Sequence, residues 1–321
     1  MSDKPFKNYD ELIDILNKRG LSITTDEEKD YAKTVLSKEG YYNLINGHNK
    51  LFLDASAGEN HYLFGATLYE IHALYQFDRI LRDIFFRYIL RVETHVKNLI
   101  SYYFSMQYGH SNYLLYTNFN TQCRDAQSKI TALIAEIQRQ TASRASDPSI
   151  SHYLKTYGYI PLWVLNNVLT LGTISKFYSL MKTPERQAVS KTFGILDNEL
   201  ESELMYLSSV RNFCAHGNRL YCYRTKNPLI DTPFHSFLSI AKNEKNEYMQ
   251  GKRDLFAALI ALKRLLSNND YKRMSKEIYR AIGNLRKKLS VINVTDVLRE
   301  MGFPEKWREL SSATVENNTQ K

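Results

Sequence analysis

Apolar residues recur at helical intervals over most of the chain, and the longest such pattern covers residues 67–108. Neither glycine nor proline interrupts this segment. Its apolar positions fall on one stripe of a helix: Leu74, Leu81, Phe85, Tyr88, Val92 and Leu99. We therefore predict one long helix that forms the backbone of a helical bundle.

Shorter helical patterns flank this segment, and several carry recognisable start and stop signals. Gly20 ends a pattern over residues 9–18, and Thr25 offers a cap for a helix through Leu36. Asp197 offers a capping residue for a helix that Gly217 stops. Further helices are predicted over residues 123–141, from Pro161, from Pro184, and over residues 254–266 and 271–289.

Three segments are expected to lie outside regular helices. Gly172-Thr173 should interrupt the helix that Pro161 opens, and the small polar residues 143–151 should form a mobile loop. Residues 41–53 alternate too weakly for a strand to be predicted. The pattern as a whole indicates an all-α fold.

Small polar residues at 55–60 separate two periodic segments and mark the first expected boundary. We predict three parts: an N-terminal helical unit over 1–58, a helical bundle over 59–250, and basic C-terminal helices with a tail over 251–321. The tail from Ser311 is polar and is expected to be disordered.

Positive charge is concentrated towards the C-terminus. The net charge is +9, and Lys+Arg against Asp+Glu number 8 and 11 in residues 1–65, 20 and 15 in 66–250, and 15 and 8 in 251–321. This asymmetry fits a polyanionic partner such as RNA. A solvated basic face without any partner is the alternative interpretation.

Several classes of protein have no motif here. The three cysteines form neither a CxxC pair nor a disulfide framework, and Cys214, His216 and Cys222 lack a fourth ligand at zinc spacing. We therefore expect no metal and no cofactor. GxxxxGK[ST], HExxH and GxSxG are absent, which removes the basis for an ATPase, a metalloprotease or an esterase. Without a long apolar run or a signal peptide, a cytoplasmic protein with no membrane partner is expected.

Arg211 and His216 are the candidate catalytic pair. A histidine can act as general acid or base and an arginine can neutralise charge on a phosphorus-centred transition state, with Asn212 orienting the two. Arg211 falls on the buried stripe of its predicted helix, which is unusual for a guanidinium. Residues five apart point about 140° away from each other in an ideal helix. The helix could end near His216, or a second copy could complete the site. A structural pair, with Arg211 ion-paired and His216 terminating the helix, is the alternative.

Two acidic residues on the long helix also lie near its apolar stripe. Asp78 is within about 50° of the middle of the stripe, and pairing with either Arg211 or Arg82 would satisfy it. Glu93 lies at the border of the stripe, where a surface or intrahelical ion pair is one interpretation.

Two basic segments are candidates for RNA binding. The first combines two basic side chains, Arg219 and Arg224, with the aromatic ring of Tyr221. Such a combination can bind phosphates and stack on nucleobases. The alternative is a loop that is held in place by its tyrosines. In the last predicted helix, four basic side chains share a face about 60° wide: Arg273, Lys276, Arg280 and Lys287. Such a face is usually only solvated, although it would also suit a structured RNA.

The motif and several other stretches resemble a known family. Arg211-Asn212-Phe213-Cys214-Ala215-His216, with the trailing Asn218-Arg219-Leu220, resembles the R-N-x-x-A-H-x-x-R-L signature of HEPN-type ribonucleases, specifically the Abi-like family of bacterial abortive-infection proteins. Further stretches agree in order: Lys4-Pro5-Phe6, Gly40-Tyr41-Tyr42-Asn43-Leu44, Phe77-Asp78-Arg79-Ile80-Leu81-Arg82, Arg91-Val92-Glu93, Pro161-Leu162-Trp163, Leu171-Gly172-Thr173-Ile174-Ser175 and Met301-Gly302-Phe303-Pro304.

The resemblance implies a HEPN-like helical bundle with a small N-terminal helical unit and a C-terminal helical extension. It implies a metal-independent endoribonuclease of phage defence, or of a toxin-antitoxin-like system, with Arg211, Asn212 and His216 of two copies facing each other in a homodimer. Glu93 would orient the arginine, and Asp78 is taken as a second supporting group. The alternative is a non-catalytic protein that holds a specific small non-coding RNA.

Overall fold

The computed structural model describes residues 5–58 and 60–313. The chain is all-α, as predicted; in the described ranges, extended pairing is limited to two isolated bridges, Leu53 with Tyr62 and Lys242 with Tyr248. The helices are α1 Tyr9–Lys18, α2 Asp26–Glu39, α3 Leu68–Tyr108, α4 Ala126–Ser143, α5 Pro148–Tyr157, α6 Leu162–Leu165, α7 Leu171–Leu180, α8 Thr183–Lys191, α9 Asp197–Ala215, α10 Pro233–Phe237, α11 Leu255–Leu265, α12 Asn268–Arg286 and α13 Val294–Glu300. Shorter π and 3₁₀ turns cover Tyr42–Asn46, Lys50–Phe52, Tyr116–Asn118 and Trp307–Ser311.

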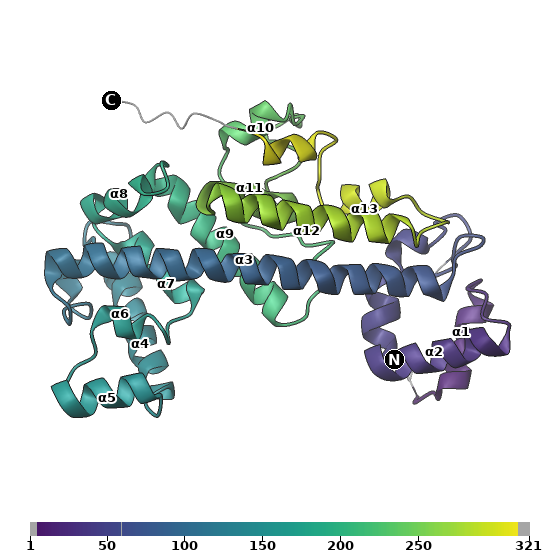
Figure 1. Ribbon diagram of the computed structural model, residues 1–321, viewed down its shortest axis with the longest axis horizontal. Coiled ribbons are helices and arrows are strands. Elements are labelled where there is room, and N and C mark those ends of the chain that lie inside the picture. The colour runs from purple at the N-terminus through teal and green to yellow at the C-terminus, as the bar shows by residue number, and fades with distance from the viewer. Residues whose placement is uncertain (1–4, 59, 314–321) are drawn as a thin grey trace.

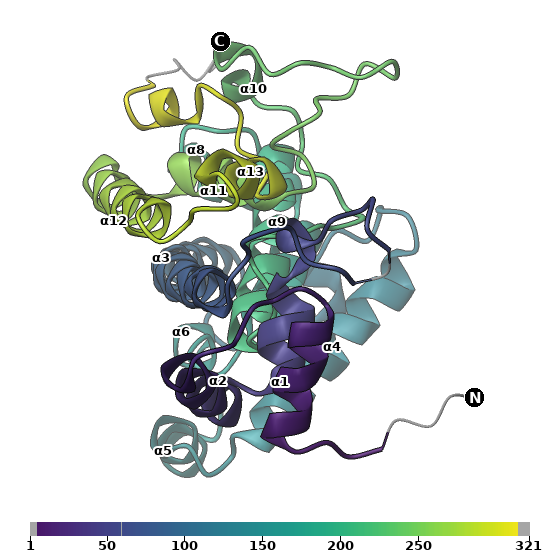
Figure 2. The ribbon, with the colours of Figure 1, turned by 90° about the vertical axis from the view of Figure 1, so that its right-hand side faces the viewer.

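Helix α3 runs most of the length of the molecule, and helices α6 to α9, α11 and α12 pack against it (Figure 1). Its 41 residues begin after Thr67, whose side chain accepts the Glu70 N–H, and end at Gly109 with a φ of 84°. Helices α11 and α12 lie along one side of α3, and α9 crosses it near the middle (Figures 1 and 2). α1 and α2 lie at the N-terminal end of α3, and α4 to α6 at the other. The predicted long helix is therefore confirmed as the axis of the fold.

Two sequence expectations around α4 to α7 are wrong. Helix α4 extends to Ser143 and α5 begins at Pro148, where the Asp147 side chain accepts the Ser149 N–H at 2.9 Å, so residues 143–151 are not a loop. Gly172 does not interrupt a helix; it lies in the first turn of α7, and the break falls before it. A Cβ at Gly172 would lie 3.2 Å from Ser208 Oγ of α9, so this glycine allows two helices to approach closely.

Helix α9 begins and ends close to where the sequence places it. Asp197 is its first residue rather than its cap, because Leu196 occupies the cap position and donates its N–H to Glu199 at 2.9 Å. The helix ends at Ala215, and Gly217 has a φ of 68°. The helical part of the motif therefore stops one residue before His216.

Buried apolar residues from all three predicted parts of the chain form one continuous core. Helices α11 and α12 match their predicted positions. Ser311 ends a 3₁₀ turn and Ala313 is 4% exposed, so the first residues of the predicted tail are ordered; residues 314–321, like Lys4, lie outside the described part. No helix within residues 5–58 and 60–313 combines the length and apolarity needed to cross a bilayer.

Candidate functional site

The Arg211 side chain projects from α9 towards α3. Its Nε lies 3.7 Å from Glu93 Oε2, and its guanidinium carbon lies 5.5 Å from the centre of the Phe86 ring. The other carboxylate oxygen of Glu93 lies 2.7 Å from Lys97 Nζ. The Arg211 side chain is 26% exposed, and it makes no hydrogen bond to any residue in the described ranges. Arg211 is thus ion-paired without a hydrogen bond: its Nε is buried opposite Glu93, and the rest of its guanidinium has no hydrogen-bond partner among the described residues.

His216 occupies the C-terminal cap of α9. Its backbone N–H donates to the Asn212 carbonyl at 3.1 Å, and its backbone has a φ of −89°. The side chains of His216 and Asn212 are exposed. Within the described part of the chain, no contact joins His216 to Arg211. One protomer therefore does not bring the two members of the motif together, in agreement with their spacing on a helix.

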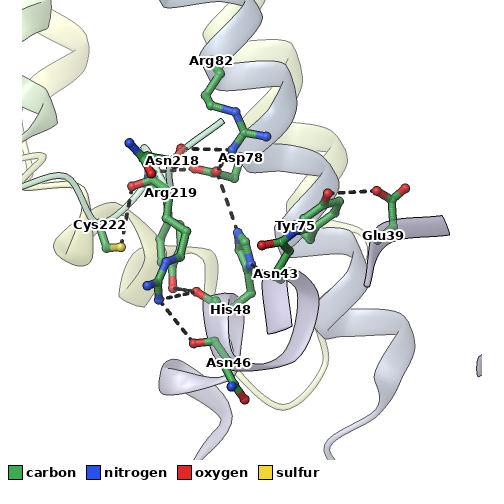
Figure 3. Close-up of polar contacts among 12 residues, drawn as sticks. Glu39, Asn43, Asn46, His48, Tyr75, Asp78, Arg82, Asn218, Arg219 and Cys222 are labelled. Carbon is green, nitrogen blue, oxygen red and sulfur yellow. Dashed lines mark hydrogen bonds and ion pairs between the residues drawn. The ribbon is translucent and has the colours of Figure 1, made fainter. Parts of the chain in front are cut away.

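Asp78 joins α3 to the segment that follows the motif (Figure 3). It is fully buried; its Oδ1 accepts the Tyr221 N–H at 2.6 Å, and its Oδ2 pairs with Arg82. Of the two partners left open by the sequence, the structure selects Arg82 over Arg211. Arg82 also donates to the Asn218 carbonyl at 3.2 Å. Asp78 and Arg82 together fix the backbone just after His216.

Asp78 does not approach Glu93. The two acids are 15 residues apart on α3, which is about 22 Å at 1.5 Å per residue. The side chain of Asp78 faces His48 instead, with Oδ2 3.8 Å from Nε2 in a fully buried setting. The two acids therefore belong to different clusters: Glu93 contacts Arg211, and Asp78 binds the backbone of the segment that follows His216.

Tyr221 is not available to RNA. It is 1% exposed, its hydroxyl donates to the Gly47 carbonyl at 3.4 Å, and its ring stacks on His48 at 5.4 Å between centroids. A base needs a free ring face for stacking, so our prediction of an RNA contact for Tyr221 is wrong. The tyrosine fastens the loop to the N-terminal unit.

Arg219 and Arg224 are exposed but also bind backbone carbonyls. Arg219 donates to Asn46 and Gly47 at 3.2 and 3.3 Å (Figure 3). Arg224 donates to the carbonyls of Tyr223 and Glu300, both at 2.9 Å. Both arginines therefore tie the segment after the motif to other parts of the molecule, and neither forms a salt bridge with an acid in residues 5–58 and 60–313.

The basic face of α12 is open to solvent. Arg273, Lys276, Arg280 and Lys287 are all exposed, and they form no ion pair with the described residues. Tyr271, Met274 and Ile278 form the buried face of the same helix. The face is accessible to a polyanion, although it lies on a different helix from Arg211 and His216.

A buried charge cluster on α9 was not identified from the sequence. Glu203 is fully buried, and Arg264 of α11 lies 3.0 Å from it and 2.7 Å from Glu199. Burial raises the pKa of Glu203 to about 8; Arg264 opposes this rise, and the negative charge of Glu199 adds to it. A helical-wheel plot would have placed Glu203 beside Leu200 and Leu207.

Lys97 was also missed, although it stands four residues after Glu93, the spacing of an intrahelical ion pair. Burial raises the pKa of the Cys214 thiol to about 12, so the thiol is protonated at neutral pH. Among the described residues no group of three or more His, Cys, Asp or Glu side chains is arranged to hold a metal ion.

The fold and the site define the class of protein. It is an all-helical protein in which buried ion pairs between acids and arginines support the end of α9, where Arg211 and His216 lie. The family model described as Abi-like protein matches residues 34–222, more than half of the chain, and the protein belongs to this family. The match includes Asp78, Glu93, Arg211 and His216, and ends before α12. Comparison with curated proteins and with solved structures finds no match. Membership of the family supports an abortive-infection, or phage-defence, context.

Proposed function

We propose that the protein is a metal-independent endoribonuclease of a phage-defence system, with an active site of HEPN type shared between two copies of the chain. The observation that carries the proposal is the state of Arg211. Its side chain is 26% exposed and makes no hydrogen bond within the described residues; its buried Nε lies 3.7 Å from Glu93, and its guanidinium lies against the Phe86 ring. It is thus placed beside the end of α9 with donors ready for a phosphate.

The proposed reaction is attack of a ribose 2′-hydroxyl on the adjacent phosphorus. His216 acts as general base or general acid: it removes the hydroxyl proton or it gives a proton to the departing 5′ oxygen, and water makes the other proton transfer. Arg211 neutralises charge on the phosphate oxygens as it develops. The P–O5′ bond breaks as the P–O2′ bond forms, so the products carry a 2′,3′-cyclic phosphate and a 5′-hydroxyl.

A second protomer is part of the proposal because Arg211 and His216 do not meet in one chain. In a two-fold dimer, the ends of the two α9 helices would face each other, and Arg211 of one copy would act with His216 of the other. Asn212, exposed on the same helix, would contact the partner and orient the pair.

Cleavage of RNA in the presence of a chelator tests the activity. We expect wild-type protein to generate cyclic-phosphate ends and His216→Ala to cleave about 100-fold more slowly, because it loses the acid-base group. His152→Ala is the matched control, since His152 is also exposed but lies on α5. Equal rates for His216→Ala and wild type would remove the assignment.

Mixing two inactive variants tests whether the site is shared. Arg211→Ala and His216→Ala each disable both composite sites of their homodimers, but a mixed dimer retains one intact site. We expect the mixture to recover up to about a quarter of wild-type activity if subunits exchange freely. A site contained in one chain predicts no recovery.

An RNA-binding protein without nuclease activity is the second candidate. The exposed basic residues of α12, which belong to a different helix from Arg211, favour it. Sequencing the RNA that copurifies with wild type and with the Arg211→Ala, His216→Ala double variant discriminates the two candidates. A defined intact RNA on both proteins supports binding alone, whereas RNA found intact only on the double variant supports cleavage.

A further inference from the structure

A cleft of about 450 Å³ lies between residues 224–228, residues 243–254 and the segment that ends α13. Four cationic side chains line it: Arg224, Lys252, Arg253 and Arg299. Ligand pockets in proteins typically measure roughly 300–1,000 Å³. The cleft is therefore large enough for a nucleotide-sized group, and neither Arg211 nor His216 lines it.

Two of its arginines are fixed in place without being neutralised. Arg224 donates to the carbonyls of Tyr223 and Glu300 at 2.9 Å, and Arg253 donates to the Lys226 carbonyl. Carbonyl oxygens orient a guanidinium but leave its full positive charge and its remaining N–H groups. By contrast, Lys252 pairs with Asp231, and Arg299 pairs with Asp296 at 3.0 Å.

The acids of the cleft offset part of this charge, because the Asp254 carboxylate interacts electrostatically with Arg224. Asp254 is 5% exposed, and its oxygens accept the N–H groups of Gly251 and Ala257 at 3.0 and 3.1 Å. It is thereby occupied in capping α11. Glu247, on the exposed turn, is the other acid of the lining. The lining as a whole therefore carries four cationic side chains against these two acids.

We propose that this cleft binds a phosphate group, either of an RNA backbone or of a free nucleotide. Fixed guanidinium groups suit phosphate oxygens because they can donate two parallel hydrogen bonds to them. That the phosphate belongs to an RNA rests on the proposed function, whereas the existence of the phosphate site does not. Arg224 and Arg253 bind the phosphate, and Arg299 adds charge at the rim.

Binding is measured on the full chain carrying His216→Ala, so that no probe is cleaved. The probes are a short fluorescein-labelled polyuridine RNA, ATP and inorganic phosphate. In this background, Arg224→Gln with Arg253→Gln should weaken binding about tenfold and reduce the slope of log affinity against log salt by about one to two. Arg124→Gln with Arg144→Gln is the matched control, because both arginines are exposed near the ends of α4. It should leave affinity and slope unchanged.

Arg224 also links backbone segments, so the melting temperature of each variant is recorded. Arg299→Gln is the second variant, since its side chain pairs only with Asp296 of its own helix in the described structure, and we expect it to weaken binding two- to threefold. Loss of ATP binding in the cleft variants identifies a nucleotide site, and loss of RNA binding alone identifies a backbone site. Absence of binding to every probe, or equal binding by the cleft and control variants, overturns the proposal. Neither result depends on whether RNA is cleaved.

Discussion

Charged side chains on the buried faces of α3 and α9 carry the candidate chemistry at the residue scale. Each is stabilised by a specific partner: Glu93 by Lys97 and Arg211, Asp78 by Arg82. Ion pairs of this kind are costly to break because one charge is left buried and uncompensated. Their positions therefore hold Arg211 and the chain after His216 at defined sites.

Glu203 predicts a pH dependence of stability. Burial raises its pKa from 4.5 to about 8, so the folded protein binds this proton more tightly than the unfolded chain. The contribution of the group to stability is complete below about pH 4.5 and declines as the pH rises towards 8. Glu203→Gln should flatten this decline in urea unfolding between pH 5 and 8. Exposed Glu244→Gln should keep the wild-type slope; a wild-type slope in Glu203→Gln as well would contradict the shift.

At the scale of elements, glycines decide how closely segments approach. Gly172 lets α7 lie against Ser208 of α9, and Gly302 packs the end of α13 against the cap of α11. A Cβ at Gly302 would lie 2.2 Å from Asp254 Cγ, and its φ of 77° already disfavours a side chain. These contacts set the position of α9 and the shape of the basic cleft.

Replacing Gly302 by alanine should lower the free energy of unfolding by about 3 kcal/mol, through overpacking together with the strained φ. Gly283→Ala is the control, because this helical glycine of α12 has nothing within 4 Å of an added Cβ. It should stabilise the protein by about 0.5–1 kcal/mol, since alanine is the better helix former. Urea midpoints distinguish the two, and similar midpoints would refute the packing account.

Across the whole molecule, Asp78 connects three distant parts of the chain. His48 of the N-terminal unit, Arg82 of α3 and the backbone of Tyr221 all meet at its carboxylate (Figure 3). Arg219 reinforces the junction through Asn46 and Gly47. The N-terminal unit is thereby joined to the segment that follows His216.

Asp78→Asn should destabilise the protein by about 3 kcal/mol, because Arg82 loses its buried partner. Hydrogen exchange should accelerate together around His48 and around Tyr221, although these residues are far apart in sequence. Asp10→Asn, which removes an exposed pair with Lys33, should change stability by less than about 1 kcal/mol. Faster exchange around only one of the two segments would show that Asp78 does not couple them.

The sequence by itself determined most of the longer helices and which of their faces are buried. The cap at Thr25 and the stop at Gly217 are local signals, and helical periodicity alone places Asp78 and Arg211 near apolar stripes. These features depend on residues a few positions apart, so they can be read along the chain.

Only the tertiary structure decided which segment packs against each buried helix face. It selected Arg82 as the partner of Asp78, buried Tyr221 against His48, and gave Gly172 a packing role in place of a helix break. It also assembled the basic cleft from Arg224, Arg253 and Arg299. Periodicity shows that a side chain is covered but not by which segment, because the covering segment is set by packing between residues distant in sequence.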